Sequence, residues 1–120
     1  MFGIAVSSSS PCVAARCAHA RAGVGVVATQ NITDPTLGPR GLDLMASGLS
    51  ATEALEKIKA EASHIEYRQV ALVDRHGGGA AFSGAKTLGT HRTVIAPDVV
   101  AAGNLLSSPA VPEKMAETFL

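Results

Sequence analysis

Apolar residues recur at every second position in several short segments of the chain. Phe2, Ile4 and Val6 alternate with small residues, and this period of two predicts a short strand at the start of the sequence. A second apolar run, punctuated by glycine, predicts a strand over residues 23–30. A looser segment of small residues, 12–20, separates the two runs, so we expect two adjacent strands with a substantial connection.

Four further segments in the second half of the chain have strand character. Residues 67–74 and 79–83 flank a glycine-rich turn, where glycine can supply the positive φ that a tight hairpin requires. Residues 93–96 form the next apolar run, which a proline ends, and residues 99–103 form another. The pattern predicts a β-hairpin followed by two more short strands.

Helical periodicity occurs in three segments. The first helix is expected to begin in the region of Pro35 and Pro39, with Asp34 or Thr36 as its cap and Pro39 in its first turn. It would place Leu37, Leu44 and Met45 on one face. This region lies between the strand at 23–30 and the clearest helix of the chain.

That clearest helix begins at Ser50. Ser50 and Glu53 have the spacing of a capping box, and Ala54, Leu55 and Ile58 form an apolar stripe behind it. A last helix is predicted near the end of the sequence, where three apolar residues spaced by four give it one apolar face: Val111, Met115 and Phe119.

The order of these elements favours a mixed α/β (α+β) fold. Strands come first, then two helices, then more strands and a final helix, which is typical of layered chains with mostly antiparallel sheets. At 120 residues the sequence predicts a single domain over residues 1–120 with one core. The chain is 47% hydrophobic but has no Trp and only three Phe, so small side chains must pack closely to form that core.

Charge and composition argue against several classes of partner. Ten basic and ten acidic residues cancel and are scattered, so the sequence shows no basic patch for nucleic acid or for an anionic membrane surface. No apolar run is long enough to span a bilayer. The histidines have no metal-binding spacing, no phosphate-binding loop is present, and we expect neither a metal nor a cofactor.

The two cysteines are expected to be buried structural residues. An offset of five positions places Cys12 and Cys17 on different faces of either a strand or a helix, which disfavours a disulfide or a shared metal. A low cysteine count is compatible with the cytoplasm, which is where we expect the protein.

Polar residues that end apolar strands are the first candidates for a binding site. Gln30 and Asn31 follow an apolar run, and their amides can offer donors and acceptors to the amide or carboxylate of a small-molecule ligand. The alternative is that both cap the strand and bind backbone groups of the next turn.

Two charged or titratable residues are further candidates. Arg40, near a helix start, could bind a substrate carboxylate, although a surface ion pair with Asp34 or Asp43 is the alternative. His91 lies in a polar loop and could act as acid or base near neutral pH.

Asn104 completes the set of candidates. It follows Gly103 at a strand end, where its amide could stabilise an oxyanion in acyl transfer or could cap a turn. We therefore predict Asn104 and His91 as catalytic candidates, and Gln30, Asn31 and Arg40 as substrate-binding candidates.

Several of these residues lie in segments that resemble a known family. The runs AGVGVVATQN, GPRGLDLMASGLSATEAL, RQVALVD, AAFSGA, GTHRT and AAGNLLSSP occur in order along nearly the whole chain. Together they resemble the prokaryotic family called domain of unknown function 1028, which is placed among the Ntn-hydrolase-like folds. The resemblance implies a helix, sheet, sheet, helix sandwich and gives weight to the GPRGL, HRT and GNLL segments as site regions.

The same resemblance implies that this chain corresponds to an N-terminal portion of the family fold. Family members begin one strand earlier, near a Thr or Ser, and continue beyond the last helix found here. The chain would then supply about half of the sandwich. Apolar faces of its sheets and helices would need a second copy or a further segment to cover them, so we expect a homo-oligomer.

Two functions are compatible with these observations. In an amide-bond hydrolase of the N-terminal-nucleophile type, the first residue attacks a carbonyl while its own α-amine takes the proton. No such nucleophile is visible here, because the sequence opens with Met1 and Phe2, so we expect that activity in a longer form of the protein. The alternative is a non-catalytic binding or assembly module with the same fold.

Overall fold

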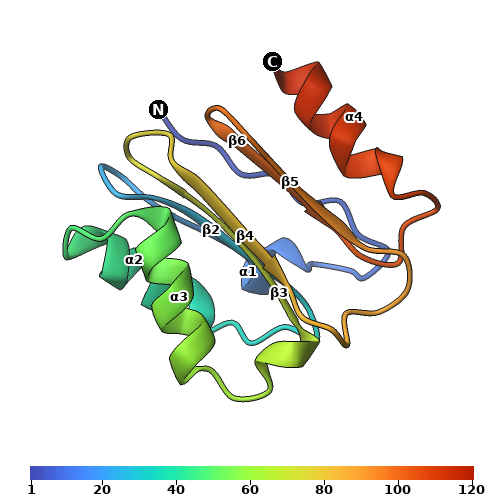
Figure 1. Ribbon diagram of the computed structural model, residues 1–120, viewed down its shortest axis with the longest axis horizontal. Coiled ribbons are helices and arrows are strands. Elements are labelled where there is room, and N and C mark those ends of the chain that lie inside the picture. The colour runs from blue at the N-terminus through green and yellow to red at the C-terminus, as the bar shows by residue number, and fades with distance from the viewer.

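The computed structural model describes residues 1–120 and contains two antiparallel sheets enclosed by helices (Figure 1). The helices are α1 (Ala14–Cys17), α2 (Leu37–Ala46), α3 (Ala51–Glu61) and α4 (Ala110–Phe119), with a 3-10 turn, η1, at Ile65–Tyr67. The strands are β1 (Ala18–Arg21), β2 (Gly25–Asn31), β3 (Arg68–Asp74), β4 (Gly79–Ser83), β5 (Arg92–Ala96) and β6 (Val99–Gly103).

The larger sheet has the strand order β1-β2-β3-β4, with every pair antiparallel. Because side chains alternate along a strand, each strand divides its residues between two faces. Val27 and Leu72 lie opposite each other on the face that α2 and α3 cover, whereas Ala28 and its partner Ala71 lie on the other face. This register gives the sheet one fully covered face and one face that is available for a second layer.

Helices α2 and α3 close the first face and form the main core there. The core joins Val27, Val70 and Leu72 of the sheet to Leu42 and Ile58 of the helices. A close approach of α2 to the sheet is possible because glycine occupies its inner surface. A Cβ at Gly38 would collide with the ring of His19 on β1.

The predicted capping box of α3 is confirmed. The Ser50 hydroxyl accepts a hydrogen bond from the Glu53 backbone N–H at 3.3 Å, and the Glu53 carboxylate accepts one from the Ser50 N–H at 2.9 Å. These hydrogen bonds hold the pKa of Glu53 below its ordinary value. The box fixes where α3 begins, as expected from the sequence.

A buried carboxylate at the end of β3 also contacts the start of α3. Asp74 accepts hydrogen bonds from the backbone N–H groups of Ala51 at 3.0 Å, His76 at 2.9 Å and Gly78 at 3.0 Å. Burial would raise its pKa, but these three donors together outweigh burial and leave the pKa lowered. Asp74 therefore links the β3–β4 turn to the N-terminus of the helix layer.

The second face of the larger sheet is covered by the β5–β6 hairpin, with α4 outside it (Figure 1). β5 packs near β4 and β6 near β3. On the outer side, Arg92 of β5 pairs with Glu113 of α4 at 2.6 Å. The layers therefore run helix, sheet, sheet, helix, which confirms the predicted α/β (α+β) sandwich class.

Residues 2–6 differ from the prediction of a strand. Phe2, Ile4 and Val6 are half-buried while Gly3 and Ala5 are exposed, so the alternation of a strand is present in their burial. The segment nevertheless makes no backbone hydrogen bond and belongs to neither sheet. It is extended chain that follows the second layer without joining it.

The expected neighbour of the second strand was also wrong. β2 lies between β1 and β3, and β1 comes from the segment 12–20, which the sequence analysis described as a loose connection.

The two cysteines differ in burial. Cys17 is buried as expected, whereas Cys12 is exposed, in a left-handed conformation just before α1. The free thiols form no disulfide.

The last helix forms where it was predicted, but its apolar stripe stays partly exposed. Met115 is 53% exposed and Phe119 is 65% exposed. The helix instead buries Pro112 and Ala116 against the hairpin, since these short side chains allow α4 to lie close to it.

Candidate functional site

A cleft of about 840 Å³ opens between the two sheets. Its floor is the second face of β2 and β3, including Val26, Ala28 and Ala71. Residues 1–6 form one side and residues 99–102 of β6 form the other. Met115 and Phe119 of α4 complete the lining, which makes the cleft mainly apolar.

Three amide side chains gather where β2, β3 and β6 bring their ends together. Gln30 and Gln69 are directly paired in the β2–β3 register, and Asn104 directly follows β6. The Asn104 Nδ2 donates to Gln69 Oε1 at 3.2 Å and to Gln30 Oε1 at 3.5 Å. These three residues, called here the amide cluster, connect the two sheets.

Gln69 is the structural member of the amide cluster. Its side chain is only 1% exposed, and its Nε2 donates to Ser83 Oγ at 2.8 Å and to the Gly103 carbonyl at 2.9 Å. Its Oε1 accepts from Asn104. A buried amide that is satisfied in this way fixes how β6 sits over β3.

Gln30 and Asn104 keep hydrogen-bonding groups free. Neither the Gln30 Nε2 nor the Asn104 Oδ1 has a partner in the protein, and both residues are half-buried. Gln30 lines the cleft. One free donor and one free acceptor, on two side chains in contact, are the complement of an amide group, whose carbonyl accepts and whose N–H donates. We call Gln30 and Asn104 the amide pair.

Asn31 adopts the alternative role of a strand cap. Its Nδ2 donates to the Tyr67 carbonyl, and its Oδ1 accepts from the Leu88 N–H at 3.1 Å. Its backbone has a positive φ of 76°, which an Asn tolerates better than most residues. Asn31 thus binds backbone groups on both sides and lies outside the cleft lining.

Arg40 lies on the far side of the sheet from the amide cluster. Its guanidinium binds Glu61 on α3 through two hydrogen bonds of 3.0 Å and one of 2.8 Å. The surface ion pair therefore exists, but its partner is Glu61 and not Asp34 or Asp43. The structure does not bring Arg40 to the cleft.

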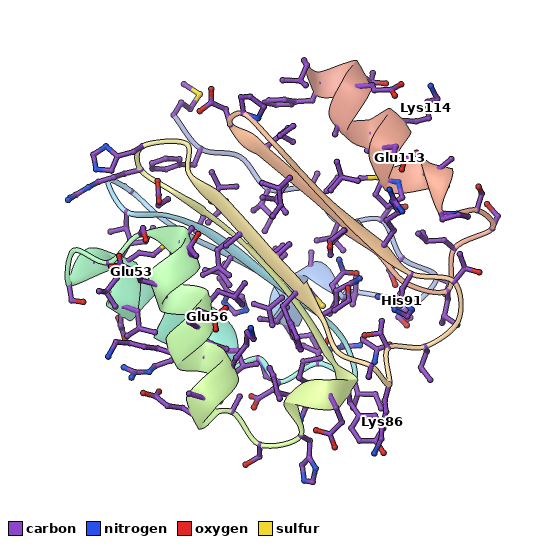
Figure 2. The ribbon with its side chains drawn as sticks, in the orientation of Figure 1. Glu53, Glu56, Lys86, His91, Glu113 and Lys114 are labelled. Carbon is purple, nitrogen blue, oxygen red and sulfur yellow. The ribbon has the colours of Figure 1, made fainter.

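His91 lies at the start of β5, in the loop that leads into the hairpin (Figure 2). Arg92 is paired with Gly103 in the hairpin register, so the next position outward places His91 across from Asn104. The His91 Nδ1 is 2.9 Å from the Gly89 carbonyl, which makes it the donor in this bond. The ring is thus engaged with its own loop, at the hairpin end that carries the amide cluster.

The opposite end of the cleft is more polar. Arg75, His76 and Asp98 line it beside Gly77, whose φ is 83°. The lining contains no Ser, Thr or Cys side chain. No group of three or more His, Cys, Asp or Glu side chains is placed to hold a metal ion.

The sequence interpretation missed Gln69. It stands within the apolar strand RQVALVD, where Val70 and Leu72 are buried on one face and Ala71 on the other. A glutamine on the same face as Ala71 suggests a polar contact between layers, and this was the available indication. Its pairing with Gln30 required knowledge of the register.

Comparisons with known proteins support the family resemblance. The model of the family described as "Family of unknown function (DUF1028)" matches residues 1–120. A crystal structure of a protein from Silicibacter pomeroyi, described with the same family, is similar with a TM-score of 0.86 and 27% identity. The similarity covers 90% of this chain and 50% of that protein, so the chain spans about half the length of this relative. No curated protein matches the sequence.

Proposed function

We propose a function for this protein, which belongs to the family of unknown function DUF1028 over residues 1–120, from the chemistry of its amide pair. The protein binds an amide group in the cleft, with the ligand carbonyl accepting from Gln30 and the ligand N–H donating to Asn104. The observation that carries this proposal is that Gln30 Nε2 and Asn104 Oδ1 both lack a protein partner in two side chains that contact each other at 3.5 Å, of which Gln30 lines the cleft. Apolar lining beside a few polar groups is typical of ligand sites.

An amide fits this pair better than a carboxylate does. A carboxylate offers only acceptors, and one of its oxygens would face the Asn104 oxygen without a proton between them. Arg92, the nearest arginine along the hairpin, is already paired with Glu113, and the cleft's own arginine, Arg75, lies at the opposite end of the lining. The proposed ligand is therefore a neutral amide rather than an acid.

Within this proposal, the full-length form of the protein is an amide-bond hydrolase with an Ntn-hydrolase-like fold. Asn104 contributes to stabilising the carbonyl oxygen, and His91, across the hairpin end, is the candidate acid or base. The nucleophile is the N-terminal residue of that longer form, as in enzymes that use their own α-amine as base. The alternative is a binding or assembly module that holds the amide without cleaving it.

Binding of small amides tests the amide pair. We expect N-acetylalanine amide to bind more tightly than N-acetylalanine, as measured by calorimetry. Gln30→Leu should weaken binding of the amide by roughly tenfold, the value of one hydrogen bond, without loss of folding. Arg40→Ala serves as the control outside the cleft and should bind normally. Equal binding of amide and acid, or an unchanged Gln30→Leu variant, would contradict the proposal.

Turnover separates the hydrolase from the binding module. The product of the native gene should be analysed by intact mass and N-terminal sequencing, and then assayed for amine release from the amides that bind. Release by a form that opens with Thr, Ser or Cys supports the hydrolase. Saturable binding without release supports the binding module.

Location and assembly form the last part of the proposal. No helix combines the length and apolar character needed to cross a membrane. We place the protein in the cytoplasm because both cysteines are free thiols. We expect a homo-oligomer because Met115, Phe119 and Leu120 expose apolar side chains. Cell fractionation and sedimentation velocity test these two points, and a secreted protein or a strict monomer would contradict them.

A further inference from the structure

The orientation of all three side-chain amides in the amide cluster follows from one backbone carbonyl. An amide side chain ends in one donor and one acceptor, and turning the end group over exchanges the two without changing its shape. A partner that can only accept therefore decides which way the amide faces. The Gly103 carbonyl is such a partner, and it lies 2.9 Å from the Nε2 of the buried Gln69.

Gln69 has only one permitted orientation. With its end group turned over, the Gln69 Oε1 would face the Gly103 oxygen with no proton between them, in a side chain that is 1% exposed. Ser83, the other partner of Nε2 at 2.8 Å, does not make this choice, because a hydroxyl both donates and accepts. The Gly103 carbonyl therefore turns the Gln69 Nε2 toward β6 and leaves the Oε1 for Asn104.

Asn104 and Gln30 are oriented in turn. The Gln69 Oε1 can only accept, so Asn104 turns its Nδ2 toward it at 3.2 Å, and the free atom of Asn104 is the acceptor Oδ1. The same Nδ2 is 3.5 Å from the Gln30 Oε1, so the free atom of Gln30 is the donor Nε2. The donor and the acceptor of the amide pair are thus set one residue at a time, starting from Gly103.

We infer that Gln69 determines the ligand specificity of the amide pair by holding Asn104 in one orientation. Gln69 is a positioning residue, because it contacts Asn104 and is not part of the cleft lining. The inference rests on the proposed function of the amide pair. Without the Gln69 acceptor, Asn104 and Gln30 could both turn their NH2 groups outward, and two donors suit a carboxylate. Gln69 therefore excludes acids from a site whose own side chains could bind them.

The ratio of amide affinity to acid affinity tests this role. By calorimetry, the wild type should bind N-acetylalanine amide about tenfold more tightly than N-acetylalanine, the value of one hydrogen bond. Gln69→Met keeps the length of the side chain and removes the acceptor for Asn104, so the ratio should fall below about threefold, with a gain in acid binding.

Ser83→Ala is the matched control. It removes one partner of the Gln69 Nε2 but leaves the Gly103 carbonyl, so the ratio should stay at the wild-type value. A purely structural role of Gln69 would weaken both ligands alike in Gln69→Met. An unchanged ratio in that variant, or a ratio that falls equally in Ser83→Ala, would overturn the inference.

NMR of the protein without ligand separates this inference from the proposed function. In the wild type, the Asn104 NH2 protons should exchange slowly with water and show a nuclear Overhauser effect to the Gln69 side chain. Both properties should be lost in Gln69→Met. If the wild type binds neither ligand, the proposed function fails and the specificity fails with it, whereas these signals still test the orientation. If Gln69→Met does not fold, rapid exchange of the Asn104 NH2 protons in the wild type would overturn the inference.

Discussion

The two faces of the larger sheet are built from similar residues but serve different purposes. On the face covered by α2 and α3, Val27, Val70 and Leu72 are at most 1% exposed. On the other face, Ala28 and Gln30 are only half-buried and line an open cleft. One face is therefore closed by helices of the chain itself, and the other leaves a cleft that can hold a ligand.

The contrast extends to the polar groups of each face. On the closed side, the carboxylate of Asp74 accepts three backbone hydrogen bonds, and the capping box satisfies the start of α3. On the open side, Gln30 Nε2 and Asn104 Oδ1 lack partners. Stability should therefore reside in the closed face and ligand binding in the open face, and substitutions can separate the two.

The largest effect is expected in the closed core. Ile58 is 1% exposed in the centre of that core, so Ile58→Ala should lower the free energy of unfolding by about 2–5 kcal/mol. Met115→Ala on the open side removes a side chain that is 53% exposed and should cost about 0.5 kcal/mol or less. Urea denaturation of both variants measures the contrast. Similar losses would mean that the open side is also part of the core.

Asp74→Ala should produce the next largest effect. The substitution leaves three backbone N–H groups without their acceptor, at a cost of about 2–3 kcal/mol at neutral pH.

The effect of Asp74 should also depend on pH. A lowered pKa means that the folded state favours the charged form, so this stabilisation is complete above the ordinary value of 3.8. It is lost as the pH falls below 3.8 through the lowered pKa of the folded state. The difference in unfolding free energy between wild type and Asp74→Ala should therefore shrink in that range. A difference that stays constant down to pH 2 would contradict this role.

The two glutamines of the amide cluster provide a matched pair. Gln69→Leu removes the donor to Ser83 and Gly103 from a buried position and should destabilise the fold by about 1–2 kcal/mol. Gln30→Leu should change stability by less than about 0.5 kcal/mol, because the one hydrogen bond it removes, from Asn104 Nδ2, is long at 3.5 Å and that donor keeps Gln69 as a partner. Thermal unfolding of both variants checks the pair. A larger loss of stability for Gln30→Leu than for Gln69→Leu would mean that Gln30, and not Gln69, is the structural residue of the amide cluster.

The smallest effect is expected at Arg40. Its pair with Glu61 is about half exposed, at 46% and 51%, so Arg40→Ala should cost only about 0.2–1 kcal/mol. High salt should reduce even this difference. Binding of N-acetylalanine amide should be unchanged. If a stably folded Arg40→Ala variant no longer bound the amide, Arg40 would have to be part of the binding site.

The closed half of the molecule was largely predictable from the sequence. The capping box of α3, the β3–β4 hairpin and the strand at β2 depend on local patterns, and local patterns are visible in a single chain. The open half was less so, because it depends on contacts between distant segments. Residues 2–6 have the period of a strand, yet no pattern shows whether another strand lies beside them.

The candidate site followed the same division. Gln30 and Asn104 were expected from their positions at strand ends, and the structure brings them together although 74 positions separate them. Arg40 and Asn31 had equally suitable local contexts, but the face on which each side chain lies is set by tertiary packing. The role of Gln69 depends on the register between β2 and β3, which the sequence alone does not reveal.

Hydrogen exchange of backbone amides would test the division of the two faces most directly. The account predicts that amides of β2, β3 and α3 exchange only through global unfolding, with protection that matches the free energy from urea denaturation. Amides of residues 2–6 should exchange by local opening or without protection, because they have no backbone partner. Equal protection of residues 2–6 and β3 at low protein concentration would contradict the account, since the segment beside the cleft would then be part of the closed core.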